Sequence, residues 1–193
     1  MTFEDMRFLF AATLHGDNRD RGILRMNYDE AELLWDCVKD TQGTIMEIGR
    51  LRGGSTVLIT AAAGPDREVI SVDIAPAHHA TAEKYFADTE FSKSLRLITD
   101  DSVNVTTGEL GLLFVDGDHS YEGVSRDIKH HWPDVVEGGL VVFHDAVPNS
   151  GLEYRNEINH CPGVTKACEE LVEAGKGEEV SKAGSVLVLK KLS

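Results

Sequence analysis

TIMEIGRLRGGST, residues 44–56, is the stretch that decides the fold of this chain. A short apolar run leads to Gly49, a bend with Gly53 and Gly54 follows, and a helix-compatible apolar run then extends from Val57 to Ala63. This order predicts a strand, a glycine-rich turn and the N-terminus of a helix. Glycine lets backbone approach a ligand closely, and the helix end adds unpaired N–H groups and a partial positive charge. Nucleotide-like cofactors bind to elements of this kind.

Apolar, β-branched runs alternate with helix-compatible runs along the rest of the chain. Further strands are expected over 68–73, 94–99, 111–116, 140–145, 178–182 and 185–191, and helices over 29–41, 55–63, 78–90, 121–136 and 164–174. Alternating strands and helices predict an α/β fold with a doubly wound, mostly parallel sheet and helices on both faces. The last two strands read as a hairpin, which predicts one antiparallel strand at the end.

Length and composition indicate one soluble domain that spans residues 1–193. The chain is 41% hydrophobic and 27% charged, which is ordinary for a globular protein, and its net charge of −14 argues against binding to nucleic acid. Three cysteines without a CxxC pair suit a reducing compartment. No signal peptide or membrane-spanning run is visible, so we expect no membrane association and a cytoplasmic location.

Acidic residues stand at the ends of the expected strands, where core packing gives no reason for them. Asp73 ends the second strand, and a carboxylate there can accept hydrogen bonds from the two hydroxyls of a ribose. The alternative is an ordinary helix N-cap.

The glycine-rich turn itself limits the choice of cofactor. A dinucleotide site has GxGxxG after the first strand, whereas this chain has ExGxxxGxS, with Glu47 before the first glycine. A carboxylate at that place repels a pyrophosphate, which disfavours an NAD-dependent dehydrogenase. It suits S-adenosylmethionine (SAM), which carries an ammonium and a sulfonium but no phosphate.

Three segments together resemble the class I SAM-dependent methyltransferases: IMEIGRLRGGST, VISVDI and LLFVDGDHSYEGVSRDIKHHWPDVVEGGLVVFHDA. The most similar branch is the small-molecule family related to macrocin O-methyltransferase, and the resemblance covers about residues 30–192. It implies a Rossmann-like sheet of seven strands with the last strand antiparallel, and SAM as the cofactor.

The resemblance also implies which residues bind the cofactor. They are Glu47, Gly49, Gly53, Gly54, Ser55, Asp73, Ile74, Asp101, Ser102 and Asp116. Glu47 would face the methionine part, Asp73 the ribose and Ile74 the adenine. Asp101 matches the segment near the adenine amino group, although Asp100 is an alternative.

The ends of the fourth and fifth strands resemble the metal site of metal-dependent O-methyltransferases. Asp116 matches a metal-binding aspartate, and His119 occupies the position of a general base three residues further on. His144 and Asp145 match further metal ligands, although macrocin-type enzymes have an acidic pair there. Mg²⁺ prefers oxygen ligands, and a histidine ligand shifts the preference toward Mn²⁺, Fe²⁺ or Zn²⁺.

Each of these residues also has a purely structural interpretation. His119 together with Asp118 can cap the helix that begins near Tyr121, and His144 can be a structural group. His119 and Asp145 are therefore expected as catalytic residues, with these alternatives open.

The sequence thus predicts O-methylation of a small hydroxylated metabolite, assisted by a divalent metal. The alternative is a methyltransferase-like module that binds SAM without transferring its methyl group. Segments 1–28 and 146–162 are the candidates for the substrate pocket. Segment 1–28 is expected to act as a lid, a substrate-binding segment or an oligomer contact. Because so little is added to the core, a second subunit of a homo-oligomer is a further source of pocket residues.

Overall fold

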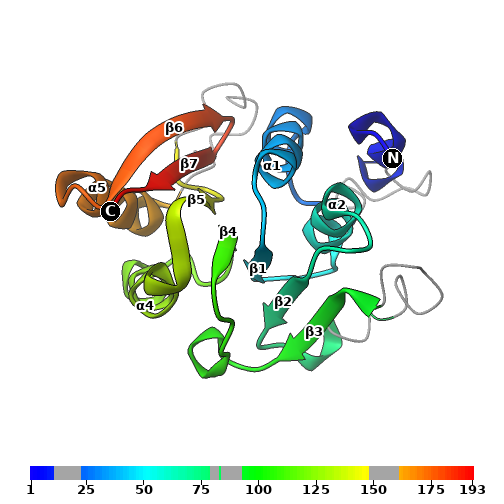
Figure 1. The fold of residues 1–193 in the computed structure, drawn as a ribbon, viewed down its shortest axis with the longest axis horizontal. Helices are drawn as coiled ribbons and strands as arrows, with labels where there is room; N and C mark the ends of the chain where they lie inside the picture. Colours follow the sequence, from blue (N-terminus) through cyan, green and yellow to red (C-terminus); the bar gives the residue numbers. More distant parts are fainter. Residues whose placement is uncertain (11–22, 79–82, 84–92, 148–160) are drawn as a thin grey trace.

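A seven-stranded sheet forms the centre of the molecule (Figure 1). The computed structural model describes residues 1–10, 23–78, 83, 93–147 and 161–193. The strands are β1 (Thr44–Ile48), β2 (Val69–Asp73), β3 (Leu95–Thr99), β4 (Leu110–Val115), β5 (Val135–Phe143), β6 (Gly177–Ala183) and β7 (Val186–Lys191). Their order is β3-β2-β1-β4-β5-β7-β6, and β7 runs antiparallel to both of its neighbours while the other pairs are parallel. The expected α/β sheet with an antiparallel last strand is confirmed.

Helices cover both faces of the sheet. They are α1 (Tyr28–Asp40), α2 (Gly54–Ala63), α4 (Tyr121–His131) and α5 (Pro162–Glu173), with 3-10 turns η1 (Phe3–Phe10), η3 (Ser102–Asn104) and η4 (Trp132–Asp134). Figure 1 shows α1 and α2 on one face and α4 and α5 on the other. The helix expected over 78–90 lies mostly outside the described residues. None of the helices in the described part of the chain has the length and apolar character needed to cross a membrane.

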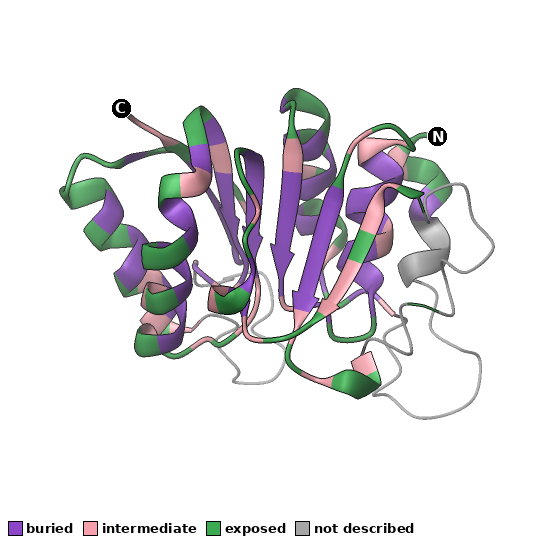
Figure 2. Ribbon diagram, turned by 60° about the horizontal axis from the view of Figure 1, so that its bottom comes forward, coloured by how far each residue is buried: buried purple, intermediate pink, exposed green. Residues whose placement is uncertain are grey.

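The core consists of two apolar layers, one on each face of the sheet. Successive side chains of a strand point to opposite faces. In β4, Leu112 and Phe114 accordingly join the layer under α1 and α2, whereas Leu113 and Val115 join the layer under α4 and α5. Figure 2 shows the central strands buried along their length and the edge strand β3 only partly buried.

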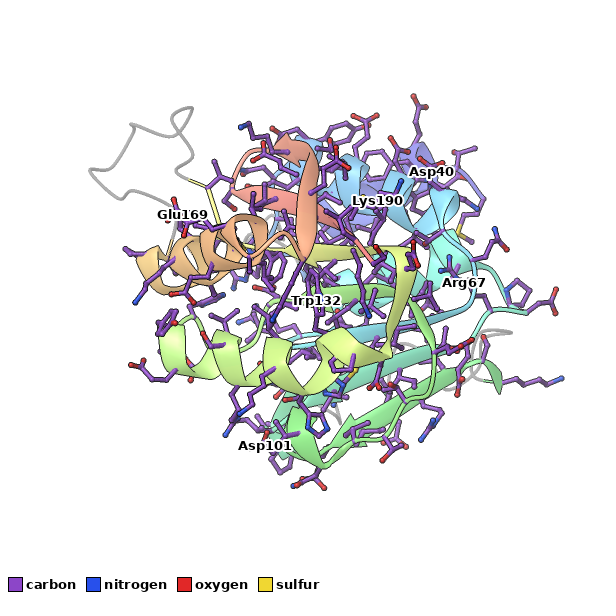
Figure 3. All side chains as sticks on the ribbon, turned by 60° about the vertical axis from the view of Figure 1, so that its left-hand side comes forward. Asp40, Arg67, Asp101, Trp132, Glu169 and Lys190 are labelled. Atoms are coloured by element: carbon purple, nitrogen blue, oxygen red, sulfur yellow. The ribbon has the colours of Figure 1, made fainter. Side chains whose placement is uncertain are left out.

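One helix boundary differs from the expectation. The helix predicted over 121–136 ends at His131, and Pro133 follows in the short turn η4. Trp132, at the start of this turn, is labelled in Figure 3. Proline has no N–H to donate to a carbonyl oxygen in the preceding turn, so the helical hydrogen-bond pattern stops there, although Trp132 keeps helical backbone angles. Strand β5 therefore begins at Val135, earlier than predicted.

The topology determines where a ligand can bind. After β1 the chain continues to β2 on one side, and β4 lies on the other side of β1. In open α/β sheets, ligands bind beyond the carboxyl ends of the strands at such a switch point. Figure 2 shows the arrowheads of the central strands ending together at one edge. The residues after β1, β2 and β4 therefore meet at this edge.

Candidate functional site

A cavity of about 690 Å³ lies at the carboxyl edge of the sheet, beside the switch point. This volume is within the usual range of pockets for small molecules. The predicted site residues that line it are Gly49, Asp73, Ile74, Asp101, Ser102, Asp116, His119, His144 and Asp145. The other four, Glu47, Gly53, Gly54 and Ser55, do not line it.

The glycines of the turn allow close approach of the chain to itself. Gly49 has φ +92°, and a Cβ there would overlap the carbonyl oxygen of Asp116, so the ends of β1 and β4 touch. Gly53 adopts a left-handed conformation at the N-cap of α2. A Cβ on Gly54 would overlap the backbone of Leu24, so the segment before α1 crosses the start of α2.

Glu47 is completely buried and faces α2. Its carboxylate accepts hydrogen bonds from the hydroxyls of Ser55 (2.5 Å), Thr56 (2.6 Å) and Ser71. Burial raises the pKa of Glu47, although these hydroxyls and the charge of Arg50 oppose the increase. The carboxylate therefore ties the first turn of α2 to β1 and β2, and it does not lie on the wall of the large cavity.

Arg50 is a buried cation that the sequence analysis missed. Its Nη1 donates to the carbonyl oxygen (2.5 Å) and hydroxyl (3.1 Å) of Ser71, and Nη2 donates to the carbonyl oxygen of Ile98 (3.1 Å). Burial lowers the pKa of Arg50, while the charges of Glu47 and Asp73 raise it. The guanidinium thus ties the turn after β1 to β2 and β3, and the charges of Glu47 and Asp73 favour its ionised form.

Asp73 is held in place by backbone N–H groups. Its Oδ2 accepts from the N–H groups of Arg50 and Leu51, both at 2.9 Å, and Oδ1 accepts from that of Ala75 at 2.8 Å. Nδ1 of His78 lies 3.0 Å from Oδ2. Burial alone would raise the pKa of Asp73, but these donors outweigh it and keep the pKa below its ordinary value. The result is an ionised, oriented carboxylate on the cavity wall.

Another part of the cavity wall is formed by η3 and α4. Asp101, labelled in Figure 3, caps η3 by accepting from the N–H of Val103 (3.3 Å), and it pairs with Arg126 at 3.0 Å. The buried hydroxyl of Ser102 donates to Oδ1 of Asp127 at 2.5 Å. Asp127 was missed by the sequence analysis, although helical spacing places it on the apolar face of α4.

Four side chains in the cavity wall form a cluster in which the potential ligand atoms all lie within 4.8 Å of one another: Asp116, His119, His144 and Asp145. Oδ1 of Asp116 lies 3.1 Å from Nδ1 of His144 and 3.2 Å from Nε2 of His119. Oδ2 of Asp145 lies 3.5 Å and 3.7 Å from the same two nitrogens. Ligands bound to one ion at right angles, each at about 2.1 Å, are about 3.0 Å apart. The donor set therefore fits a divalent cation, and its two nitrogens favour Mn²⁺, Fe²⁺ or Zn²⁺.

Electrostatic effects within the cluster are strong. Burial alone would raise the pKa of Asp116, but the charge of His144 and hydrogen bonds from both histidines lower it overall. Burial would lower the pKa of His144, but Asp116 and the other carboxylates around it raise this pKa well above its ordinary value. The pKa of His119 is raised, chiefly by its hydrogen bond with Asp116. His119 is therefore positioned either to take a proton or to act as a further ligand.

Behind the cluster lies Glu30 of α1, which the sequence analysis also missed. This buried carboxylate approaches Nε2 of His144 to 3.7 Å. Its pKa is lowered to about 2: burial alone would raise it, but the contact with His144 and the N–H groups of Ser185 and Asn27 outweigh burial. Glu30 precedes Leu34 by four residues, which places it on the apolar face of α1. A charged residue on an apolar helix face is the sequence signal by which Glu30 could have been identified as a candidate site residue.

Comparisons with known proteins place this arrangement in context. Residues 46–146 match the family described as "Methyltransferase domain". No curated protein matches the chain. Three solved structures have a similar fold. The methyltransferase PaMTH1 of Podospora anserina, bound to SAH, is 18% identical with a TM-score of 0.72, over 99% of this chain and 86% of that one. The O-methyltransferase TomG of Streptomyces achromogenes, in complex with SAM, is 14% identical with a TM-score of 0.69, over 91% and 83%. An O-methyltransferase of Bacillus cereus, in complex with SAH, is 14% identical with a TM-score of 0.65, over 98% and 90%.

Proposed function

Because this chain belongs to the methyltransferase-domain family and is a SAM-dependent methyltransferase, we propose that it methylates a hydroxyl oxygen of a small metabolite with the help of a divalent cation. The proposal assigns the methyl donor to the end of the cavity near Asp73. It assigns the acceptor to the cluster of Asp116, His119, His144 and Asp145.

The observation that carries the proposal is that one cavity joins these two places. Seven aspartates line it: Asp73, Asp100, Asp101, Asp116, Asp118, Asp127 and Asp145. Such a lining disfavours a cofactor with phosphate groups and complements one with an ammonium and a sulfonium. The oriented carboxylate of Asp73 suits two ribose hydroxyls. SAM fits this cavity better than a dinucleotide does.

The cluster supplies what an O-methyl transfer requires. The acceptor hydroxyl gives its proton to Nε2 of His119. Its oxygen forms a bond to the methyl carbon as the bond from that carbon to sulfur breaks, and the electron pair stays on sulfur, which leaves S-adenosylhomocysteine. A divalent cation held by Asp116, His144 and Asp145 would act as a Lewis acid that lowers the pKa of the hydroxyl. Positioning of the two reactants accounts for much of the expected rate enhancement.

Two of the similar structures are consistent with oxygen as the acceptor atom, although they share only the fold with this chain. The TomG and Bacillus cereus proteins are both described as O-methyltransferases, and TomG acts in tomaymycin synthesis. At 14% identity, this support extends to the fold and not to the acceptor. The acceptor class therefore rests on the cluster.

Calorimetry and turnover measurements test the proposal. We expect micromolar binding of S-adenosylhomocysteine and no binding of NAD. With SAM and a panel of small catechols, sugars and phenols, product should form in the presence of Mn²⁺ or Mg²⁺ and disappear in EDTA. Asp116→Asn should abolish turnover, whereas Asp66→Asn, outside both the cluster and the cavity, should retain it.

Three outcomes would contradict parts of this proposal. Tight binding of S-adenosylhomocysteine without methylation of any compound would favour a SAM-binding module. Full turnover in EDTA would remove the cation from the mechanism. An unchanged kcat in His119→Ala would remove the base.

A further inference from the structure

We propose that Asp127 of α4 recognises the amino group of the cofactor's adenine and thereby selects a 6-aminopurine over a 6-oxopurine. This inference rests on the proposed use of SAM. It extends the base-binding surface beyond the loop after β3, where the sequence places Asp101 and Ser102, to a helix that follows β4.

The position of Asp127 carries the first step. Its side chain comes from α4, is only 4% exposed and lines the large cavity. Ser102, whose hydroxyl donates to Oδ1 at 2.5 Å, lines the same part of the cavity. Asp73, Ile74, Ser102 and Asp127 all line this one cavity, so a base attached to a ribose at Asp73 shares it with Ser102 and Asp127.

The second step concerns the other carboxylate oxygen. Oδ2 lies on the side of Gly117, where an added Cβ would be 3.7 Å from it. Among the residues that the structure describes, no side chain or backbone N–H donates to Oδ2. Arg126, the next residue, directs its Nη2 to Asp101 at 3.0 Å, and Nε2 of His131 lies 2.9 Å from the carbonyl oxygen of Ser102. Both side chains therefore have other partners.

A carboxylate oxygen on the cavity wall can accept a hydrogen bond from a bound ligand. Burial raises the pKa of Asp127, although the hydrogen bond from Ser102 lowers it. The exocyclic amino group of adenine can donate such a bond. Hypoxanthine has a carbonyl oxygen at the same position, and two acceptors would then face each other. Asp127 thus favours the amino form by attraction and disfavours the oxo form by repulsion.

A purely structural role is the competing explanation, because Asp127 also holds Ser102 at the start of η3. The two roles differ in one measurable property, which is the preference between two bases. A substitution that only disturbs the structure weakens the binding of both ligands equally. A change in base recognition alters the ratio of the two binding affinities.

The experiment compares S-adenosylhomocysteine with S-inosylhomocysteine by calorimetry. We expect the unmodified protein to bind the adenine compound roughly ten- to a hundredfold more tightly, as for other amino-versus-oxo discrimination. In Asp127→Asn, the amide oxygen can still accept from Ser102 and the amide N–H groups can donate to the oxo group. The preference should therefore shrink by about tenfold or reverse. Asp127→Ala should lose the preference without a gain in affinity for the inosine compound.

Glu122→Gln is the matched control, because it removes one carboxylate from an exposed position on the same helix. It should leave the ratio unchanged, and circular dichroism should show all variants folded. An unchanged ratio in both Asp127 variants would overturn this inference and leave the proposed function intact. Failure of the unmodified protein to bind either compound would overturn the proposed function, and this inference with it.

Discussion

Oε2 of Glu30 lies 3.7 Å from Nε2 of His144, so the first long helix places a carboxylate directly behind the cluster of Asp116, His119, His144 and Asp145. Glu30 is held by Ser185, whose N–H and hydroxyl donate to Oε1 at 2.7 Å and 2.9 Å, and by the N–H of Asn27, which donates to Oε2 at 2.7 Å. A Cβ on Gly184 would overlap Oε1, so the turn between β6 and β7 also depends on this carboxylate. A carboxylate behind a ligating histidine fixes the tautomer and orientation of the ring.

Glu30→Gln should therefore weaken cation binding without changing the ligands themselves. We expect the Kd for Mn²⁺, measured by calorimetry, to rise about ten- to a hundredfold, and the electron paramagnetic resonance spectrum of bound Mn²⁺ to change. Glu32→Gln, an exposed position on the same helix, is the control and should bind Mn²⁺ normally. An unchanged Kd for Mn²⁺ in Glu30→Gln, relative to the unmodified protein, would show that His144 does not need the carboxylate of Glu30.

The succession of strands along the chain could be predicted from the sequence, because each parallel strand is an apolar run followed by a change to glycine or polar residues. The carboxyl ends of these strands share one edge, so Asp73, Asp116 and Asp145 were expected together. The structure brings all three to one cavity. Their roles toward a cofactor and a cation stay predictions.

Contacts between helix side chains and the site residues, such as Glu30 with His144 and Asp127 with Ser102, could not be predicted. They depend on how each helix docks on the sheet. Glu30 and Asp127 both fall on apolar faces, which signals burial but not the partner. The orientation of Glu47 had a clearer signal. Side chains alternate along a strand, so Glu47 shares its face with Ile45, which packs in the layer under α1 and α2.

Gly49→Ala should be strongly destabilising. The residue needs φ +92°, and a Cβ would overlap the carbonyl oxygen of Asp116, so the ends of β1 and β4 would have to separate. We expect a loss of about 3 kcal/mol or more in the free energy of unfolding, measured with urea. Gly64→Ala is the control, because Gly64 has φ +81° but open space around it, and it should cost about 1 to 3 kcal/mol through backbone strain alone. A similar loss of unfolding free energy in both variants would contradict the close approach of Gly49 to the carbonyl oxygen of Asp116.

Asp73→Asn should weaken the binding of S-adenosylhomocysteine. The amide has only one oxygen left to accept hydrogen bonds, whereas the carboxylate uses both oxygens for backbone N–H groups and offers its charge to the ligand. We expect the calorimetric Kd to rise about ten- to a hundredfold. Asp66→Asn, in the loop before β2, controls for the change in charge and should bind normally. Unchanged affinity in Asp73→Asn would remove the ribose contact from the proposal.

The three cysteines should differ in reactivity. Burial raises the pKa of all three thiols, to about 12 for Cys37 and Cys168, and Cys161 differs from these two in being only partly buried. At pH 8 the two buried thiols are ionised to about one part in ten thousand, and the thiolate is the reactive form. We expect Ellman's reagent to modify one thiol in the native protein and three in guanidinium chloride. Cys161→Ser should abolish the reaction of the native protein. Rapid labelling of two or more thiols in the native protein would contradict the burial of Cys37 and Cys168.

Asp127→Asn should stabilise the protein at neutral pH. Burial raises the folded-state pKa of Asp127 above its ordinary value of 3.8, so the neutral form is favoured by folding. The stability that this group contributes is complete below pH 3.8 and is lost as the pH rises through the folded-state pKa. An asparagine never ionises and avoids that loss. We therefore expect the Tm of Asp127→Asn, relative to the unmodified protein, to increase as the pH is raised from 4 to 7. Glu122→Gln should show no such trend, and a constant difference for Asp127→Asn would mean that burial does not penalise the charged carboxylate.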